Sequence, residues 1–199
     1  MYALPNQTIE QAQADIETAC ATGVSHISAY HLTLEPNTLF YQCPPQLPDD
    51  ELSADMQALI EQTLKNSGFA RYEISAFAHS GHRSRHNLNY WKFGDYLGIG
   101  AGAHSKISFR GKIIRQMRYK HPKKYLEVLL NHSNSPVQTE QELQTGDRIF
   151  EFMMNALRLT RGFPPRLFAE RTGLALEAIR PQLDEAAAQV RASGQRAAC

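Results

Sequence analysis

The sequence has few cysteines, and they stand far apart. Cys20, Cys43 and Cys199 are the three cysteines in 199 residues, and no two have the close spacing from which iron–sulfur or zinc sites are usually built. An odd, scattered set also argues against a disulfide framework. The chain alone therefore predicts no iron–sulfur cluster. Cys20 falls on the apolar side of a predicted helix and is expected to be a buried small hydrophobe.

The sequence also lacks long apolar runs and a strong net charge. No apolar stretch approaches the roughly 20 residues that cross a bilayer, and the first residues do not resemble a signal peptide. The formal net charge is +1, which gives no overall attraction to nucleic acid or membranes. Because 42% of the residues are apolar, the chain can still bury a core. We expect a soluble, cytoplasmic, globular protein.

Strand and helix patterns alternate over the first 77 residues. Thr8 and Gln11 form a capping box that predicts a helix start, and Gly23 is placed to end that helix. A strand is expected over residues 26–34, followed by a Pro-rich loop. A second helix over residues 49–66 and a strand over residues 69–77 come next. This order is typical of a parallel α/β sheet, whose first strand is nearly absent here.

The rest of the chain predicts a hairpin and then helices. Residues 106–109 and 112–117 flank Arg110-Gly111, a hairpin signal, and Pro122 opens a helix to about residue 130. Thr139 with Glu142 predicts the capping box of a further helix, and two short helices are expected around Thr172-Gly173. The division falls near residues 131–138, giving domains 1–131 and 139–199. The expected core face after the second capping box is Ile149, Phe150, Phe152, Met153, Leu157 and Leu159.

Residues 78–90 break the periodicity with histidine, arginine and asparagine, which predicts an irregular functional loop. Neutral imidazole ligates haem iron well, and a nearby tyrosine can ligate, hydrogen-bond or pack on a porphyrin. His86 is the central candidate. A surface or hydrogen-bonding role is the simpler alternative. Zinc held by His79, His82 and His86 is another, although no fourth ligand is evident.

Two further patterns have structural alternatives. Gly98, Gly100 and Gly102 do not make a dinucleotide fingerprint, because the last glycine falls too early and no βαβ unit follows. Residues 110–124 contain several cations and no acidic residue, so this basic strip could meet haem propionates, an acidic partner or phosphates, or it could be a solvated face. The cations of the basic strip are Arg110, Lys112, Arg115, Arg118, Lys120, Lys123 and Lys124.

The segment His86-Asn87-Leu88-Asn89-Tyr90 is an HNxxY arrangement, and Trp-x-Phe-Gly-Asp-Tyr-Leu-Gly-Ile-Gly-Ala-Gly-Ala-His follows it directly. Together they resemble radical SAM proteins of the HemW haem chaperone type, relatives of oxygen-independent coproporphyrinogen III oxidase. Residues 2–12, 26–40 and 86–106 resemble that family in the same order. The resemblance implies an α/β fold: the C-terminal part of a radical SAM partial (β/α) barrel, followed by a small, incomplete winged-helix-like helical domain.

The resemblance also implies site residues. HNxxY is implicated in haem binding in that family, so His86, Asn87 and Tyr90 are assigned to haem, with His86 as the axial ligand of the iron. Thr33 and His104 align with positions near S-adenosylmethionine, and tight packing is the alternative for each. The family's [4Fe-4S] cluster motif, CxxxCxxC, is absent from this chain. Residues 190–199 depart from the family pattern, which predicts a frayed, truncated or frameshifted end.

The implied function is binding of haem and its delivery to haem-dependent enzymes, whose identity the sequence does not reveal. One alternative is the oxidative decarboxylation of coproporphyrinogen III in porphyrin synthesis, which HNxxY disfavours. Another is a nucleic-acid-binding module built on residues 110–124, although the helices of residues 163–189 carry acidic groups where a reading surface would be basic. The last alternative is a truncated product without activity.

Overall fold

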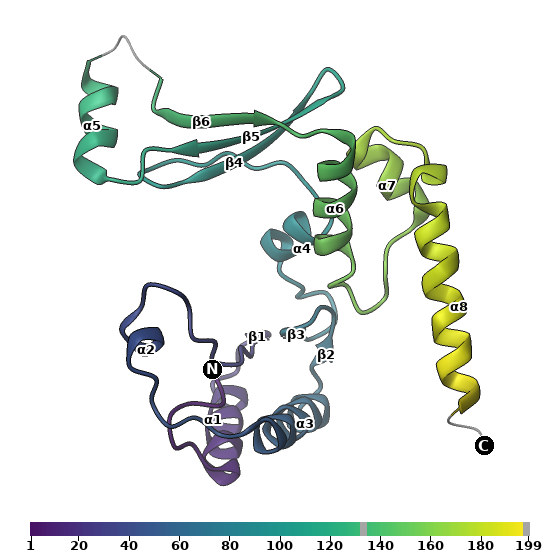
Figure 1. Cartoon of the computed structure of the whole chain (residues 1–199). Helices are drawn as coiled ribbons and strands as arrows, with labels where there is room; N and C mark the ends of the chain where they lie inside the picture. Colours follow the sequence, from purple (N-terminus) through teal and green to yellow (C-terminus); the bar gives the residue numbers. More distant parts are fainter. Residues whose placement is uncertain (132–134, 197–199) are drawn as a thin grey trace. The chain divides into compact units, whose positions relative to one another are not determined.

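The structure is a computed structural model that describes residues 1–131 and 135–196 (Figure 1). It divides into two compact units, one of residues 1–85 and 159–161 and the other of residues 86–158 and 162 onwards. Within the described residues, each unit contains helices and a three-stranded sheet. The boundary expected at residues 131–138 falls partly outside the described residues, so the division into domains 1–131 and 139–199 stays a prediction.

The first unit is built on helices α1 (Ile9–Ala21), α2 (Leu39–Gln42) and α3 (Asp50–Asn66). α1 begins at the predicted capping box, and Gly23 beyond its end has φ +75°. α1 and α3 lie side by side (Figure 1) and share a core. α2 was not predicted, because its four residues lie within a Pro-rich segment that was expected to be a loop. The buried core residues are Tyr2, Ala3, Ala12, Ile16, Met56, Ile60, Leu64, Phe69 and Phe77.

The sheet of the first unit consists of β1 (His26–Ser28), β2 (Ala70–Arg71) and β3 (Ala76–Ala78), in the order β1-β3-β2. Both pairings are antiparallel. The expected parallel order of these strands is therefore wrong.

The direction differs because the strand expected over residues 69–77 folds into two. Tyr72 N donates to Ala76 O at 3.1 Å, so the chain reverses between β2 and β3 and β3 returns beside β1. The strand expected over residues 26–34 is also shorter than predicted. Beyond β1, His31 forms an isolated parallel bridge with Tyr2.

The second unit contains α4 (Arg85–Trp91) at its start and then a hairpin of β4 (His104–Phe109) and β5 (Lys112–Arg118). The predicted turn is confirmed: Arg110 and Gly111 have φ +50° and +77°, the left-handed values of a tight hairpin turn. β6 (Val137–Glu142) pairs with β5 antiparallel, giving the order β4-β5-β6 (Figure 1).

Helices complete the second unit: α5 (Pro122–Leu130), α6 (Thr145–Ala156), α7 (Pro165–Thr172), a 3₁₀ turn (Leu176–Ile179) and α8 (Arg180–Arg196). Phe152 of α6 is at the centre of their core, with rings of three other phenylalanines packed edge-on against it. The buried core residues are Phe93, Ile113, Leu143, Phe152, Ala156, Leu167, Phe168 and Ile179.

The second capping box was predicted at the wrong residues. Thr139 and Glu142 lie in β6, where their backbones pair with β5. α6 begins three residues later, and the reciprocal cap is formed by Gln144 and Asp147. β6 was not predicted because it is an exposed, mostly polar edge strand, without the alternation of apolar and polar residues that indicates a strand.

The expected core face of α6 is only partly correct. Phe152 is fully buried, but Phe150 and Leu157 are 67% and 65% exposed. Leu159 lies in the first unit, where it pairs with Glu73. The end predicted to be frayed is helical through Arg196 in α8, and residues 197–199, with Cys199, lie outside the described residues.

Two phenylalanines of α6 provide a matched test of this packing. We expect Phe152→Ala to lower the free energy of unfolding by about 3–5 kcal/mol, because a fully buried ring is replaced by a cavity. Phe150→Ala, on the exposed side of the same helix, should stay within about 0.5 kcal/mol of the parent. Urea unfolding followed by circular dichroism measures both. Equal losses in the two variants would contradict the placement of the core.

Candidate functional site

The HNxxY residues lie on a helix, not on the irregular loop that was expected. α4 (Arg85–Trp91) carries His86, Asn87 and Tyr90. Because residues four apart lie on the same helix face, the rings of His86 and Tyr90 are neighbours, with centroids 4.9 Å apart and planes at 58°. His86 is exposed, while Asn87 and Tyr90 are half-buried. The imidazole is thus presented to solvent with an aromatic ring beside it.

A sharp turn follows α4. Phe93 N donates to Tyr90 O at 2.9 Å and Gly94 N to Asn89 O at 2.7 Å. Phe93 has φ +54°, an uncommon value for a residue with a side chain. A Cβ on Gly94 would lie 2.8 Å from the backbone oxygen of Asn89, so a larger residue does not fit unless the backbone shifts. The chain turns back, and Tyr96 reaches the side of Tyr90 with ring centroids 4.5 Å apart.

The turn is held by a buried lysine on β4. Lys106 Nζ donates to Phe93 O at 3.0 Å, to Asp95 Oδ1 at 2.8 Å and to Ser108 Oγ at 3.3 Å. It also lies 4.1 Å from the centroid of the Phe93 ring. The Lys106 side chain is 1% exposed and that of Asp95 is 41% exposed. One ammonium group therefore fixes the residues that connect α4 to the sheet.

The environment shifts the pKa of both members of this ion pair. Burial lowers the pKa of Lys106, although the hydrogen bond from its ammonium to Asp95 acts in the opposite direction. For Asp95, burial raises the pKa, but the hydrogen bonds from Lys106 and Ser108 outweigh it and the net shift is downward. Asp95 therefore stays ionised in the folded chain.

The residues predicted to contact S-adenosylmethionine fall in different units. Thr33 is exposed in the first unit, and His104 is the exposed first residue of β4 in the second. Their assignment stays a prediction. Nearby, Gly98 N donates to Ser105 Oγ at 2.9 Å, and a Cβ on Gly98 would clash with the backbone carbonyl of His104. A glycine is needed there for close backbone packing against β4.

The other candidate metal ligands in the described part of the chain do not form a metal-binding group. His79 stacks on Phe69 with centroids 4.0 Å apart, and its Nδ1 lies 3.0 Å from Gly68 O. Cys20 is half-buried against the first core and Cys43 is exposed, both as free thiols. Among residues 1–131 and 135–196, no group of three His, Cys, Asp or Glu side chains could hold a metal ion. These residues do not fit an iron–sulfur cluster, and they give no support to zinc.

Carboxylates from outside residues 110–124 neutralise part of the basic strip. Lys112 Nζ lies 2.8 Å from Glu142 Oε2, and Lys124 Nζ lies 3.2 Å from Glu127 Oε1. Arg115 Nε donates to Glu151 Oε2 of α6 at 2.9 Å. The three carboxylates belong to Glu142 of β6, Glu127 of α5 and Glu151 of α6, and all three lie outside residues 110–124 in the sequence. The positive charge seen in the sequence is therefore reduced in the fold.

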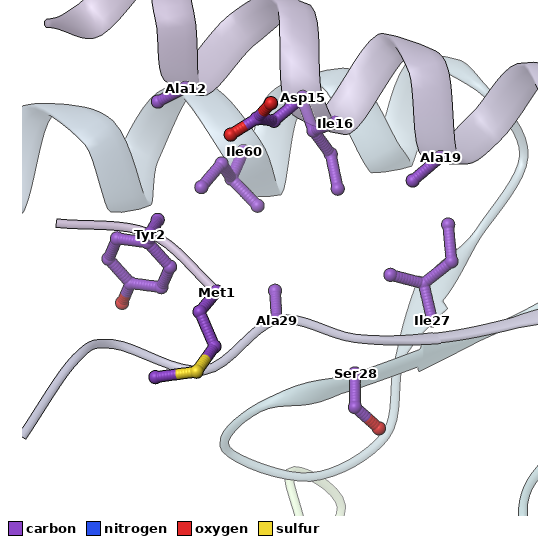
Figure 2. A pocket seen from close by; sticks show the side chains of 10 residues that line it. All are labelled: Met1, Tyr2, Ala12, Asp15, Ile16, Ala19, Ile27, Ser28, Ala29 and Ile60. Carbon is purple, nitrogen blue, oxygen red and sulfur yellow. The ribbon is translucent and has the colours of Figure 1, made fainter. Parts of the chain in front are cut away.

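One apolar cavity is too small to hold a porphyrin. It lies in the first unit between α1, α3 and the chain around Tyr2 and Ala29 (Figure 2), and its volume is about 120 Å³. Cavities that enclose drug-sized ligands measure about 300–1,000 Å³. Apart from Asp15 and Ser28, its lining is mainly apolar. A haem would therefore not be enclosed in this cavity.

Sequence reasoning missed the residues that support α4. Lys106 was placed in the hairpin without a role, Arg115 was considered only as a cation of the basic strip, and Tyr96 was not singled out. One signal was available for Lys106. A lysine at an inward position of a strand is rarely fully buried unless it is paired, so its partner could have been sought among nearby carboxylates.

A family model described as the HemN C-terminal domain matches residues 143–192. The haem chaperone HemW of Escherichia coli strain K12 is 43% identical over 190 residues, which cover 95% of this chain and 49% of that protein. HemW of Haemophilus influenzae is 45% identical over 192 residues, covering 95% and 48%. The chain spans about half the length of the curated relatives it matches.

The solved structure of Escherichia coli coproporphyrinogen III oxidase (HemN), a radical SAM enzyme, aligns with a TM-score of 0.66. The alignment covers 87% of this chain and 42% of that one, at 17% identity, so it shows the fold alone. The predicted fold class is confirmed: the chain is α/β and shares its fold with part of a radical SAM enzyme.

The predicted family resemblance is also confirmed, because the chain is a homologue of the HemW proteins over nearly its whole length. None of the helices in the described part of the chain combines the length and apolar character needed to cross a membrane.

The buried ion pair gives a pH-dependent prediction. Asp95→Asn leaves the buried ammonium of Lys106 without a carboxylate, and we expect a loss of about 1–3 kcal/mol at neutral pH, toward the lower end because Asp95 is partly exposed. The folded-state pKa of Asp95 is lowered. The stability that ionised Asp95 contributes is therefore complete at pH values above the ordinary pKa of aspartate. It is lost as the pH falls through and below that pKa.

Urea unfolding at a series of pH values from 7 to 3 measures this difference. The gap between the parent and Asp95→Asn should narrow in acid. Glu142→Gln is the matched control, since it removes the carboxylate of an exposed ion pair with Lys112 and should change stability little. A gap that stays constant with pH would show that Asp95 does not act through its charge.

Proposed function

We propose that this chain binds haem at the exposed face of α4, as part of a HemW-type haem chaperone. The observation that carries the proposal is the pairing of His86 with Tyr90 on one helix face, inside a chain homologous to proteins named haem chaperone HemW. Ligand chemistry therefore favours this segment, and the homology supports haem as the ligand.

His86 is the axial ligand in this proposal. A neutral imidazole nitrogen coordinates haem iron, and the exposed position of His86 leaves room for a porphyrin to approach. The ring of Tyr90, 4.9 Å from that of His86, can pack against the porphyrin or hydrogen-bond to it. Asn87, half-buried on the same helix, orients α4.

An exposed site suits a protein that gives up its ligand. Haem held on the surface of α4 keeps one face and its edges available to an acceptor, whereas an enclosing cavity would have to open before transfer. The acceptor in this proposal is a haem-dependent enzyme. The open geometry around His86 supports delivery more than permanent storage.

The family resemblance implies S-adenosylmethionine and a [4Fe-4S] cluster for the full-length radical SAM relatives. When bound, such a cluster supplies an electron that cleaves S-adenosylmethionine to a radical. The described residues of this chain do not fit a cluster, and no step proposed here depends on one. Thr33 and His104 remain the candidates for contact with S-adenosylmethionine.

Coproporphyrinogen III oxidation is the second candidate function, and the fold shared with HemN favours it. The relatives at 43% and 45% identity are nevertheless named haem chaperones. Anaerobic incubation of a full-length relative of this chain with coproporphyrinogen III, S-adenosylmethionine and reductant separates the two functions. Formation of protoporphyrinogen would favour the oxidase.

The haem proposal is tested by titrating the chain with ferric haem. We expect the parent to give a Soret band typical of histidine ligation. His86→Ala should shift that band and weaken binding roughly tenfold or more, since 1.4 kcal/mol of lost coordination corresponds to a factor of ten. His121→Ala is the matched control, because His121 is another exposed histidine of the second unit and should bind haem like the parent.

Two results would overturn this assignment. One is a His86→Ala complex with the same Soret band and affinity as the parent. The other is an equal loss in His86→Ala and His121→Ala, which would indicate non-specific binding to surface histidines.

A further inference from the structure

Tyr90 has a second aromatic neighbour that HNxxY does not include. The ring of Tyr96 lies beside that of Tyr90 with centroids 4.5 Å apart and planes at 39°, while His86 lies 4.9 Å from Tyr90. Tyr90 is therefore in contact with both His86 and Tyr96. Tyr90 and Tyr96 are half-buried and belong to the surface of the second unit, outside its buried core.

The backbone of Tyr96 is fixed to the sheet. Tyr96 N donates to Lys106 O and Lys106 N donates to Tyr96 O, each at 3.0 Å. Lys106 in turn pairs with Arg115 across β4 and β5. Because directly paired residues place their side chains on the same face of a sheet, Tyr96, Lys106 and Arg115 form one row.

Arg115 fixes the phenol of Tyr96. Arg115 Nη1 donates to Tyr96 Oη at 2.5 Å, and the guanidinium carbon lies 5.8 Å from the centroid of the ring. Arg115 Nε donates to Glu151 Oε2 of α6 at 2.9 Å, and its Nη2 contacts the same oxygen. The Arg115 and Glu151 side chains are 28% and 21% exposed, so solvent screens this pair only partly.

We propose that Tyr96, anchored by Arg115 and Glu151, is a positioning residue of the haem site that fixes the ring of Tyr90 beside His86. The inference rests on the proposed function, because it assigns these residues a role at the same site. A ring that is already immobilised loses less conformational freedom when a ligand packs on it. The contacts from α6 through β5 to α4 therefore organise the site before haem arrives.

Ferric haem titration of Tyr96→Leu and Tyr96→Phe tests the inference. Tyr96→Leu removes the ring that contacts Tyr90, and we expect haem affinity to fall about 2- to 10-fold, the factor for one side chain that must be immobilised on binding. Tyr96→Phe keeps the ring and loses only its anchor, so its affinity should lie between those of Tyr96→Leu and the parent. Tyr119→Leu, another half-buried tyrosine of the second unit, should bind haem like the parent.

Electron paramagnetic resonance of the ferric complexes distinguishes positioning from stability. If Tyr96 orders the site, Tyr96→Leu broadens the haem signal through varied orientations of the His86 ligand, and Tyr96→Phe restores most of the parent signal. A role in stability alone would lower the unfolding temperature and leave the signal of the folded complex unchanged.

The failures of the two proposals differ. Parent-like affinity and signal in Tyr96→Leu, together with loss of haem in His86→Ala, would overturn the inference and leave the proposed function intact. No difference between His86→Ala and the parent would overturn both. If Tyr96→Leu does not fold, the haem affinity of Tyr96→Phe decides, and an affinity equal to that of the parent would overturn the inference.

Discussion

The ammonium of Lys106 is buried and donates to the carbonyl of Phe93 and to the carboxylate of Asp95. A charge removed from water is costly unless it is hydrogen-bonded. Because Lys106 lies on β4 and both acceptors lie just after α4, these hydrogen bonds hold the segment after α4 against β4. The turn uses an uncommon backbone conformation at Phe93. Its cost is offset by burial of the Phe93 ring in the core of the second unit. The position of Tyr96 beside Tyr90 follows from this arrangement.

The same arrangement explains how a short helix can carry a defined site. α4 has seven residues, and helices of that length are marginal by themselves. It is stabilised at its C-terminal end by the Phe93 turn, and Tyr96 packs on its surface through Tyr90. His86 remains exposed while the residues behind it are fixed. In the proposed function, these two properties serve the entry of haem and its later release.

Sequence patterns predicted features whose cause is local. The Thr8 capping box and the hairpin turn at Arg110-Gly111 depend on a few neighbouring residues, and both are confirmed. The helical state of α4 was missed, because histidine and asparagine have modest helix propensity and its support comes from Lys106 and Tyr96. The antiparallel sheet of the first unit and β6 were missed for the same reason, since pairing partners far apart in the sequence decide them.

The central claim is that haem binds at α4, on a segment organised by the turn that follows it. Hydrogen–deuterium exchange followed by mass spectrometry, with and without haem, tests this claim most directly, because it locates protection along the chain. The account predicts slower amide exchange over residues 85–96 when haem is added, and little change over residues 110–124. Protection confined to residues 110–124, with α4 unchanged, would contradict it and would place haem on the basic strip.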